Sequence, residues 1–260
     1  MAEESPRHNF FVTGVLAVVC SLLVSLTAIG LGARQERNRE LDRMRNILVV
    51  TGLYDPAVPI EEAFSTIEIR LIDMETGEYV EETEAPPDYD QRLALASKDL
   101  SSPVPNKEDI AGINRKEKYS WVYLVTDGDR LDQVVLPVRG RGLFSTLYAY
   151  LSLDSDLKTV RGITFYEHGE TAGLGAEVEN TDWTAKWPGK LVYDEGGEVR
   201  LALVKGGVNP SSTASQYQVD ALSGATITSK GVTSLVKYWF GDAGFEPYLR
   251  QLAQEGAASG

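Results

Sequence analysis

The chain carries no charged side chain from Phe10 to Leu31. As a helix, such a segment extends about 33 Å, against about 30 Å of hydrocarbon in a bilayer. A cleaved signal peptide is the alternative, but its apolar region is usually shorter and a small-residue cleavage site follows it. Here the segment continues directly into residues 34–48, RQERNRELDRMRNIL, whose pattern is helical. We therefore expect an uncleaved transmembrane helix over residues 10–32.

Composition excludes several classes of protein. The formal net charge is −13, and so acidic a surface repels the phosphate backbone of nucleic acids. Cys20 is the single cysteine, so an internal disulfide and an iron–sulfur cluster are both excluded. The two histidines, His8 and His168, are far apart in sequence, which argues against a metal or haem centre built on several histidines.

Strand patterns dominate the rest of the chain. Alternating apolar residues bounded by turn residues predict strands over 66–79, 119–126, 134–138, 145–153, 159–166, 190–194 and 199–204. Asp127-Gly128 and Gly196-Gly197 are typical of hairpin turns. Because hairpins join the strands and helical patterns lie at the ends, we expect an α+β domain with a largely antiparallel sheet and peripheral helices.

The predicted organisation has five parts. They are an N-terminal tail (1–9), a transmembrane helix (10–32), a connecting helix and linker (33–59), one α+β domain (60–250) and a C-terminal tail (251–260). Within the domain we expect a short helix over 60–64 and a surface excursion over 81–109, which is rich in Glu, Asp, Pro and Ser.

A glycine-rich loop follows the strand expected to end at Tyr166, and it reads EHGETAGLG over residues 167–175. Its glycines allow the backbone to approach a ligand closely, and Glu170 and Thr171 add an acceptor and a hydroxyl. From these residues alone, an ordinary glycine-rich turn remains the favoured interpretation. His168 is expected to be a hydrogen-bonding structural residue rather than a ligand.

The second loop, DALSGATIT over residues 220–228, precedes a helix predicted over 227–240 by one apolar stripe. Thr226, Thr228 or Ser229 can cap this helix through a side-chain oxygen. The free N–H groups of a helix start also favour a phosphate. A capped helix start without a ligand is favoured from spacing alone, because the chain has neither a Walker lysine pattern nor GxGxxG.

A chain with these two loop motifs after a single N-terminal span resembles the C subunit of the Na⁺-translocating NADH:quinone oxidoreductases. The segments RGLFSTLYAYLSL (141–153) and ITFYEHGE (163–170) resemble the same family, and the likeness extends from the apolar helix to about Phe240. The resemblance implies a single FMN-binding domain. It also implies that FMN is joined through its phosphate to the hydroxyl of the threonine that ends S-G-A-T, which is Thr226 here.

The resemblance further implies which residues surround the flavin. They come from the second loop, from the glycine-rich loop and from the RGLFSTLYAYLSL segment: Ser223, Gly224, Ala225, Thr228, Glu170, Thr171, Gly173, Leu174, Gly175, Phe144 and Ser145. The family usually has tryptophan in place of Phe144 and proline in place of Ala172. We expect the Glu170 carboxylate to lie against the isoalloxazine; the alternative is that it points to solvent. No residue is expected to act as a catalyst, and no metal is expected.

The implied function is an electron-carrying flavoprotein subunit of a sodium pump that oxidises NADH and reduces quinone, inactive without its partner subunits. Maturation would require a flavin transferase. One rival is the G subunit of the Rnf complex, which shares the anchor and the covalent FMN but serves ferredoxin and NAD⁺. The other is a membrane-anchored binding or sensor domain without a cofactor. The complete HGETAGLG motif and the acidic excursion favour the sodium-pump subunit over the Rnf subunit.

The two arguments about orientation disagree. Five arginines between residues 34 and 45 follow the apolar segment, and counting positive residues places the C-terminal domain in the cytoplasm. The resemblance instead implies a bacterial inner-membrane protein whose flavin domain faces the periplasm. We follow the resemblance, because Glu36, Glu40 and Asp42 dilute the arginine cluster.

Overall fold

The computed structural model describes residues 6–87 and 89–258. Residues 1–5 of the expected N-terminal tail and residues 259–260 of the expected C-terminal tail lie outside this part. The chain divides into two compact units between Met44 and Arg45. Helix α1 (Pro6–Thr51) contributes to both units, and its segment Asn9–Gly32 is long and apolar enough to cross a membrane.

The second unit is built on a six-stranded sheet in which every neighbouring pair is antiparallel. The strand order is β2-β1-β5-β6-β7-β8. The bounds are Ile67–Asp73 for β1, Tyr79–Val80 for β2, Tyr119–Asp127 for β5, Arg130–Arg141 for β6, Thr146–Asp154 for β7 and Val160–Glu167 for β8. The predicted α+β class with a largely antiparallel sheet is confirmed.

Shorter elements connect and cover this sheet. The helices are α2 (Ile60–Phe64), α3 (Thr181–Thr184), α4 (Thr226–Trp239) and α5 (Glu246–Ala258). The 3₁₀ helices are η1 (Glu82–Glu84), η2 (Leu93–Ala96), η3 (Gly175–Glu179) and η4 (Thr213–Tyr217). Strands β3 (Ser101–Pro103) and β4 (Arg115–Glu117) pair antiparallel, whereas β9 (Ala202–Val204) and β10 (Gln218–Asp220) pair parallel.

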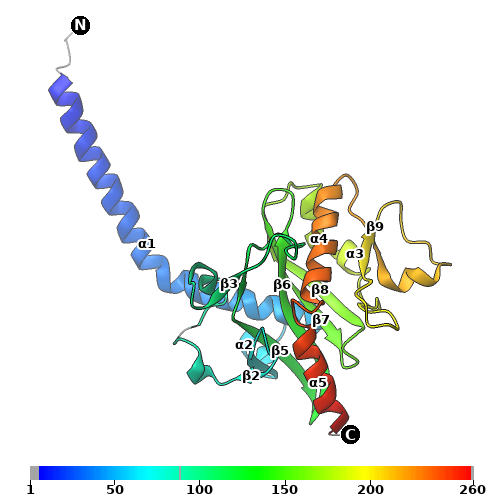
Figure 1. Ribbon diagram of the computed structural model, residues 1–260. Helices are drawn as coiled ribbons and strands as arrows, with labels where there is room; N and C mark the ends of the chain where they lie inside the picture. The colour runs from blue at the N-terminus through cyan, green and yellow to red at the C-terminus, as the bar shows by residue number, and fades with distance from the viewer. Residues whose placement is uncertain (1–5, 88, 259–260) are drawn as a thin grey trace. The chain divides into compact units, whose positions relative to one another are not determined.

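Helix α4, orange in Figure 1, lies across one face of the sheet and packs closely on β6. A Cβ at Gly140 would lie 2.9 Å from Leu235 Cβ, and a Cβ at Gly231 would collide with the carbonyl oxygen of Arg141. Glycine at both positions therefore lets the helix touch the strand. The apolar stripe predicted for this helix is buried, and each such side chain contributes about 1.5–3 kcal/mol.

The other face of the sheet is covered by the last residues of α1 and by α2. Ile47 and Leu48 are fully buried, and Gln133 Nε2 on β6 donates to the Thr51 carbonyl oxygen at 3.1 Å. Phe64 of α2 packs edge-on against Tyr123 of β5, with ring centroids 6.4 Å apart. Both faces of the sheet are therefore buried, so this unit has the two-sided core of a stable domain.

The structure differs from the predicted elements in several places. Residues 190–194, predicted as a strand, form only isolated bridges, and the strand predicted over 199–204 shortens to β9. Gly196 and Gly197 lie in the turn between Tyr193 and Val199, the two partners of one of these bridges. Helix α5 has no counterpart among the predicted elements, although Tyr248, Leu249 and Leu252 give it an apolar face. It crosses residue 250, the proposed end of the domain, and buries Leu249 and Leu252.

An ion pair is buried where β4, β6 and α4 meet. The side chains of Arg139 and Glu117 are 8% and 1% exposed, with one aligned hydrogen bond from Nη1 to Oε1 at 2.8 Å. The second contact, Nη2 to Oε2 at 2.6 Å, is close enough for an ion pair but lacks hydrogen-bond alignment. Arg139 also lies 5.1 Å from the centroid of the Trp239 ring, so the pair links the sheet to the last turn of α4.

We expect Glu117→Gln to lower the free energy of unfolding by about 3–5 kcal/mol, because it leaves the buried Arg139 guanidinium without a counter-charge. Glu68→Gln is the matched control, since Glu68 pairs with Arg70 at the surface and exposed pairs contribute about 0–1 kcal/mol. Urea unfolding of the full chain, followed by tryptophan fluorescence, measures both. Equal losses in the two variants would show that the buried pair has no special role.

Candidate functional site

The Glu170 carboxylate joins the glycine-rich loop to two other segments. Its Oε2 accepts a hydrogen bond from Thr228 Oγ1 in α4 at 2.6 Å. Its Oε1 accepts from the backbone N–H groups of Phe144 at 2.9 Å and Ser145 at 3.4 Å, in the turn between β6 and β7. Glu170 is only 9% exposed, so the alternative that it points to solvent is wrong.

The carboxylate is held in its charged form. Burial by itself would raise the pKa of Glu170, but the hydrogen bonds from Thr228 and from the backbone N–H groups of residues 143–145 outweigh it and lower the pKa below 4.5. A folded-state pKa below the unfolded one means that Glu170 stabilises the fold above pH 4.5. That contribution is lost as the pH falls through the lowered value.

Two glycines make room for this carboxylate. A Cβ at Gly142 would lie 2.5 Å from Glu170 Oε1, and a Cβ at Gly175 would lie 2.5 Å from Glu170 Oε2 and 2.7 Å from Thr228 Oγ1. Any other residue at either position would displace the carboxylate. The resemblance implies a place beside the flavin for Gly175 and none for Gly142, and the structure gives both a packing role.

Helix α4 begins at Thr226 without a side-chain cap. Its N-cap residue is Ala225, so the prediction that Thr226, Thr228 or Ser229 caps the helix is wrong. The hydroxyls of the last two are engaged elsewhere, since Thr228 donates to Glu170 and Ser229 Oγ donates to the Ala225 carbonyl at 2.9 Å. Thr226 is exposed, and among the described residues none forms a hydrogen bond with its side chain.

The glycine-rich loop and the S-G-A-T loop touch each other. Gly224 has φ +73°, and a Cβ there would lie 2.9 Å from Leu174 Cδ2. Leu174 is 44% exposed, as are Phe144 (66%) and Ile227 (56%), so three apolar side chains stand at the surface near the start of α4. Ile227 was not among the predicted site residues, although its position between Thr226 and Thr228 was a signal for it.

The remaining predicted residues form the surface and the supports of the same region. Ser223, Thr171 and Gly173 are exposed, and Ala225 is buried. Ser145 Oγ accepts a hydrogen bond from Gly169 N at 2.5 Å, which ties the glycine-rich loop to the turn before β7. The structure thus brings every predicted site residue into one region around Glu170 and the start of α4.

His168 and Arg92 form hydrogen bonds with residues of the glycine-rich loop. His168 Nδ1 accepts from Glu170 N at 3.1 Å, which confirms the predicted hydrogen-bonding role. Its Nε2 lies 2.9 Å from Glu179 Oε1, at ion-pair distance but without hydrogen-bond alignment. Arg92, from the surface excursion, binds Glu167 through two hydrogen bonds at 2.7 and 2.8 Å. Sequence alone gave no signal for this last pair, because its members are distant in the chain.

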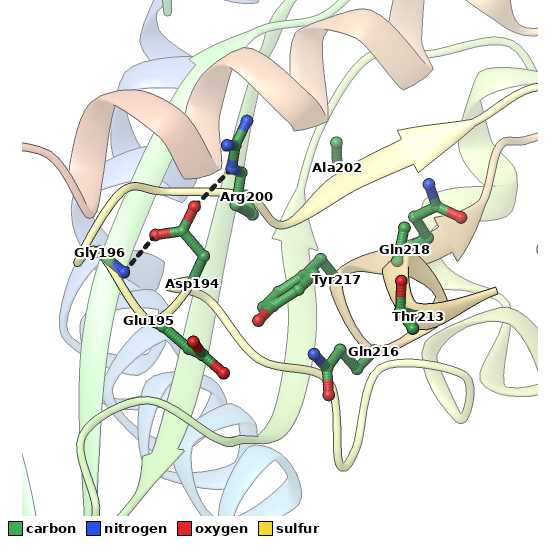
Figure 2. A pocket seen from close by; sticks show the side chains of 10 residues that line it. Asp194, Glu195, Gly196, Arg200, Ala202, Thr213, Gln216, Tyr217 and Gln218 are labelled. Atoms are coloured by element: carbon green, nitrogen blue, oxygen red, sulfur yellow. Dashed lines mark hydrogen bonds and ion pairs between the residues drawn. The ribbon is translucent and has the colours of Figure 1, made fainter.

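A surface cavity of about 630 Å³ lies elsewhere, beside β9 and η4 (Figure 2). The Asp194 carboxylate in it accepts from Gly196 N at 2.9 Å and binds Arg200 Nε at 2.7 Å. Asp194 and Arg200 therefore neutralise each other, and none of the predicted site residues lines the cavity. The lining residues are Asp194, Glu195, Gly196, Arg200, Ala202, Thr213, Ala214, Gln216, Tyr217 and Gln218. We place the candidate site at the start of α4 and not in this cavity.

Comparison with known proteins identifies the domain in which this site lies. The family model of the FMN-binding domain matches residues 142–241, a range that contains the β6–β7 turn, the glycine-rich loop and all of α4. Among solved structures, the crystal structure of Shewanella oneidensis NqrC superposes with a TM-score of 0.76 at 33% identity. The match covers 84% of this chain and 99% of that one. Fold and site thus define a protein with an FMN-binding domain behind an apolar N-terminal helix.

Full-length relatives narrow the class to one family. The C subunit of the Na⁺-translocating NADH-quinone reductase of Pseudomonas aeruginosa is 42% identical, over 96% of this chain and 97% of the relative. The protein of the same name from Yersinia pestis is also 42% identical, over 99% and 98%. The chain belongs to the family of the C subunits of the Na⁺-translocating NADH:quinone oxidoreductases. These names agree with the leading interpretation of the sequence, a C subunit of this enzyme.

We expect Glu170→Gln to lower the free energy of unfolding at pH 7 by about 1–2 kcal/mol, because neutral hydrogen bonds replace charge-assisted ones. The difference between the two chains should shrink as the pH falls below 4.5 and Glu170 of the parent takes up a proton. Urea unfolding of the full chain between pH 7 and pH 3 tests this.

Glu195→Gln is the control, because Glu195 is exposed in the turn after Asp194. At each pH in this range, Glu195→Gln should have the same unfolding midpoint as the parent chain. If the loss in Glu170→Gln did not depend on pH, the carboxylate charge would not be what stabilises the site.

Proposed function

We propose that this chain is a membrane-anchored flavoprotein subunit of a Na⁺-translocating NADH:quinone oxidoreductase. In this proposal FMN is esterified through its phosphate to Thr226 and relays electrons from NADH towards quinone, coupled to sodium export. Family membership and the FMN-binding domain support the subunit and the cofactor. The attachment residue is the one that the resemblance implies, and the geometry of the site supports it.

The observation that carries the attachment proposal is the state of the hydroxyls around the start of α4. Thr228 is 1% exposed and donates to Glu170, and Ser229 is 4% exposed and donates to Ala225. Thr226 and Ser223 are exposed. Of these two, only Thr226 lies in the helix, where the free backbone N–H groups and the helix dipole favour a phosphate.

The residues of the site suit the two ends of FMN, its phosphate and its isoalloxazine ring. The first turn of α4 contains no acidic residue, and no side chain of residues 6–87 or 89–258 caps its free N–H groups. The exposed side chains of Phe144, Leu174 and Ile227 offer an apolar surface beside Thr226 for the isoalloxazine. Phenylalanine at 144 supplies an aromatic face without an indole donor. Because the protein carries a net charge of −13, a covalent ester would retain a dianionic ligand that an open, noncovalent site would lose.

The chain's own residues would position the flavin, and bound FMN would supply the electron transfer. Glu170 fixes the relation between the glycine-rich loop and α4, and its charge near the ring would disfavour added negative charge there. We further propose that the segment Asn9–Gly32 anchors the chain in a bacterial inner membrane with the flavin domain in the periplasm. Partner subunits would bind NADH and quinone, and a flavin transferase would form the ester.

We expect the mass of the chain purified from its native host to exceed the sequence mass by FMN less one water. The denatured chain should also fluoresce as a flavin on a gel. Thr226→Ala should abolish both signals, because it removes the hydroxyl that forms the bond to phosphorus. Thr228→Val is the control: it breaks the hydrogen bond to Glu170 but should keep the flavin. Flavin fluorescence that persists in Thr226→Ala would move the attachment to Ser223 or Thr228.

We expect the flavinylated full chain to be inactive alone. Its sequence has no GxGxxG motif for a nicotinamide nucleotide and too few cysteines for an iron–sulfur cluster. In detergent, NADH should leave the flavin absorbance unchanged over minutes, whereas dithionite should bleach it. Rapid bleaching by NADH without partner subunits would contradict the relay proposal.

A further inference from the structure

Lys230 stands one helical turn beyond Thr226 on α4, and it is exposed. Residues four apart in a helix share a face, with Cβ atoms about 5–6 Å apart. Helical side chains also lean towards the N-terminus, so a residue covers the surface over the preceding turn. The Lys230 ammonium therefore has the side chain of Thr226 within its reach.

Within the described residues, Lys230 has neither an ion pair nor a hydrogen bond from its ammonium group. Two other cations beside the loops are engaged: Arg92 binds Glu167, and Lys186 binds Asp220 at 2.7 Å. The carboxylate of Glu170 is not available to Lys230, because its two oxygens accept hydrogen bonds from Thr228 and from the backbone N–H of Phe144. Among the described residues, Lys230 is thus an unpaired cation on the same helix as Thr226, one turn away.

The helix dipole does not favour a lysine near this end of α4. The N-terminus of a helix is its positive end, and a cation close to it is repelled by the helix dipole. The first turn of α4 has no acidic residue that would offset this repulsion. An anion on Thr226 would reverse the sign of the interaction, because it would be attracted by the helix start and by the ammonium together.

We propose that Lys230 is a positioning residue that pairs with the phosphoryl group of the flavin ester on Thr226. The inference rests on the proposed function, because it requires the ester. A phosphodiester keeps one negative charge whatever the oxidation state of the flavin. The ion pair therefore does not depend on the redox state of the flavin, and it restricts the conformations of the phosphoester linkage at Thr226.

A double-mutant cycle tests the pairing without measuring enzyme activity. Four full-length chains are purified in one detergent: the parent, Lys230→Gln, Thr226→Ala and the double variant. Urea unfolding is followed by tryptophan fluorescence, and intact mass reports the flavin. With the ester present, Lys230→Gln should raise the unfolding equilibrium constant about two- to fivefold. In the Thr226→Ala background the same change should have no effect or a stabilising one.

Lys237→Gln is the matched control, since Lys237 is an exposed lysine of the same helix about 16 Å from Thr226. It should act equally in both backgrounds. Lys230→Arg, which keeps the charge, should retain the coupling, and 1 M salt should reduce it.

The outcomes separate the two ideas. Equal effects of Lys230→Gln in both backgrounds, with the flavin mass present in the chains that retain Thr226, overturn the role of Lys230 and leave the proposed function intact. A parent chain without the flavin mass overturns the proposed function, and the inference falls with it.

Discussion

The arrangement of the site depends on one buried carboxylate. Glu170 accepts hydrogen bonds from Thr228 in α4 and from the backbone of the turn between β6 and β7, so three segments distant in sequence are held at fixed separations. In a low-dielectric setting these charge-assisted bonds are strong, and losing one would leave a buried charge unsatisfied. Gly142 and Gly175 are required because the carboxylate occupies the space that a side chain there would need.

The sheet supplies the rigidity that this carboxylate needs. Gly231 brings α4 into contact with the Arg141 carbonyl, and Trp239 Nε1 donates to the Arg139 carbonyl at 2.6 Å at the other end of the helix. The helix is thereby fixed to β6 along its length. Its first residue, Thr226, stays at the surface beside the glycine-rich loop, where a modifying enzyme can reach it.

Electrostatics then distinguishes this position from the rest of an acidic protein. The chain carries a net charge of −13, yet the first turn of α4 has no acidic residue and no cap, and the Glu170 charge nearby is already bound. A phosphate at Thr226 would meet free N–H groups and the Lys230 ammonium instead of carboxylates. The neighbouring exposed side chains are apolar, so charge and shape both suit a ligand with an anionic end and a flat ring.

The sequence alone determined the apolar span, the antiparallel strands over 119–166 and the apolar stripe of α4, because each follows from a local period. The S-G-A-T and glycine-rich loops were also visible in it. Only the tertiary structure decided that Thr228 is engaged, since its partner Glu170 reaches it only once the chain has folded. Ser229 is engaged locally, with Ala225 one helical turn before it. The tertiary structure likewise decided the uncapped start of α4, the Arg92–Glu167 link and the packing of α5, because contacts between residues distant in sequence leave no periodic pattern.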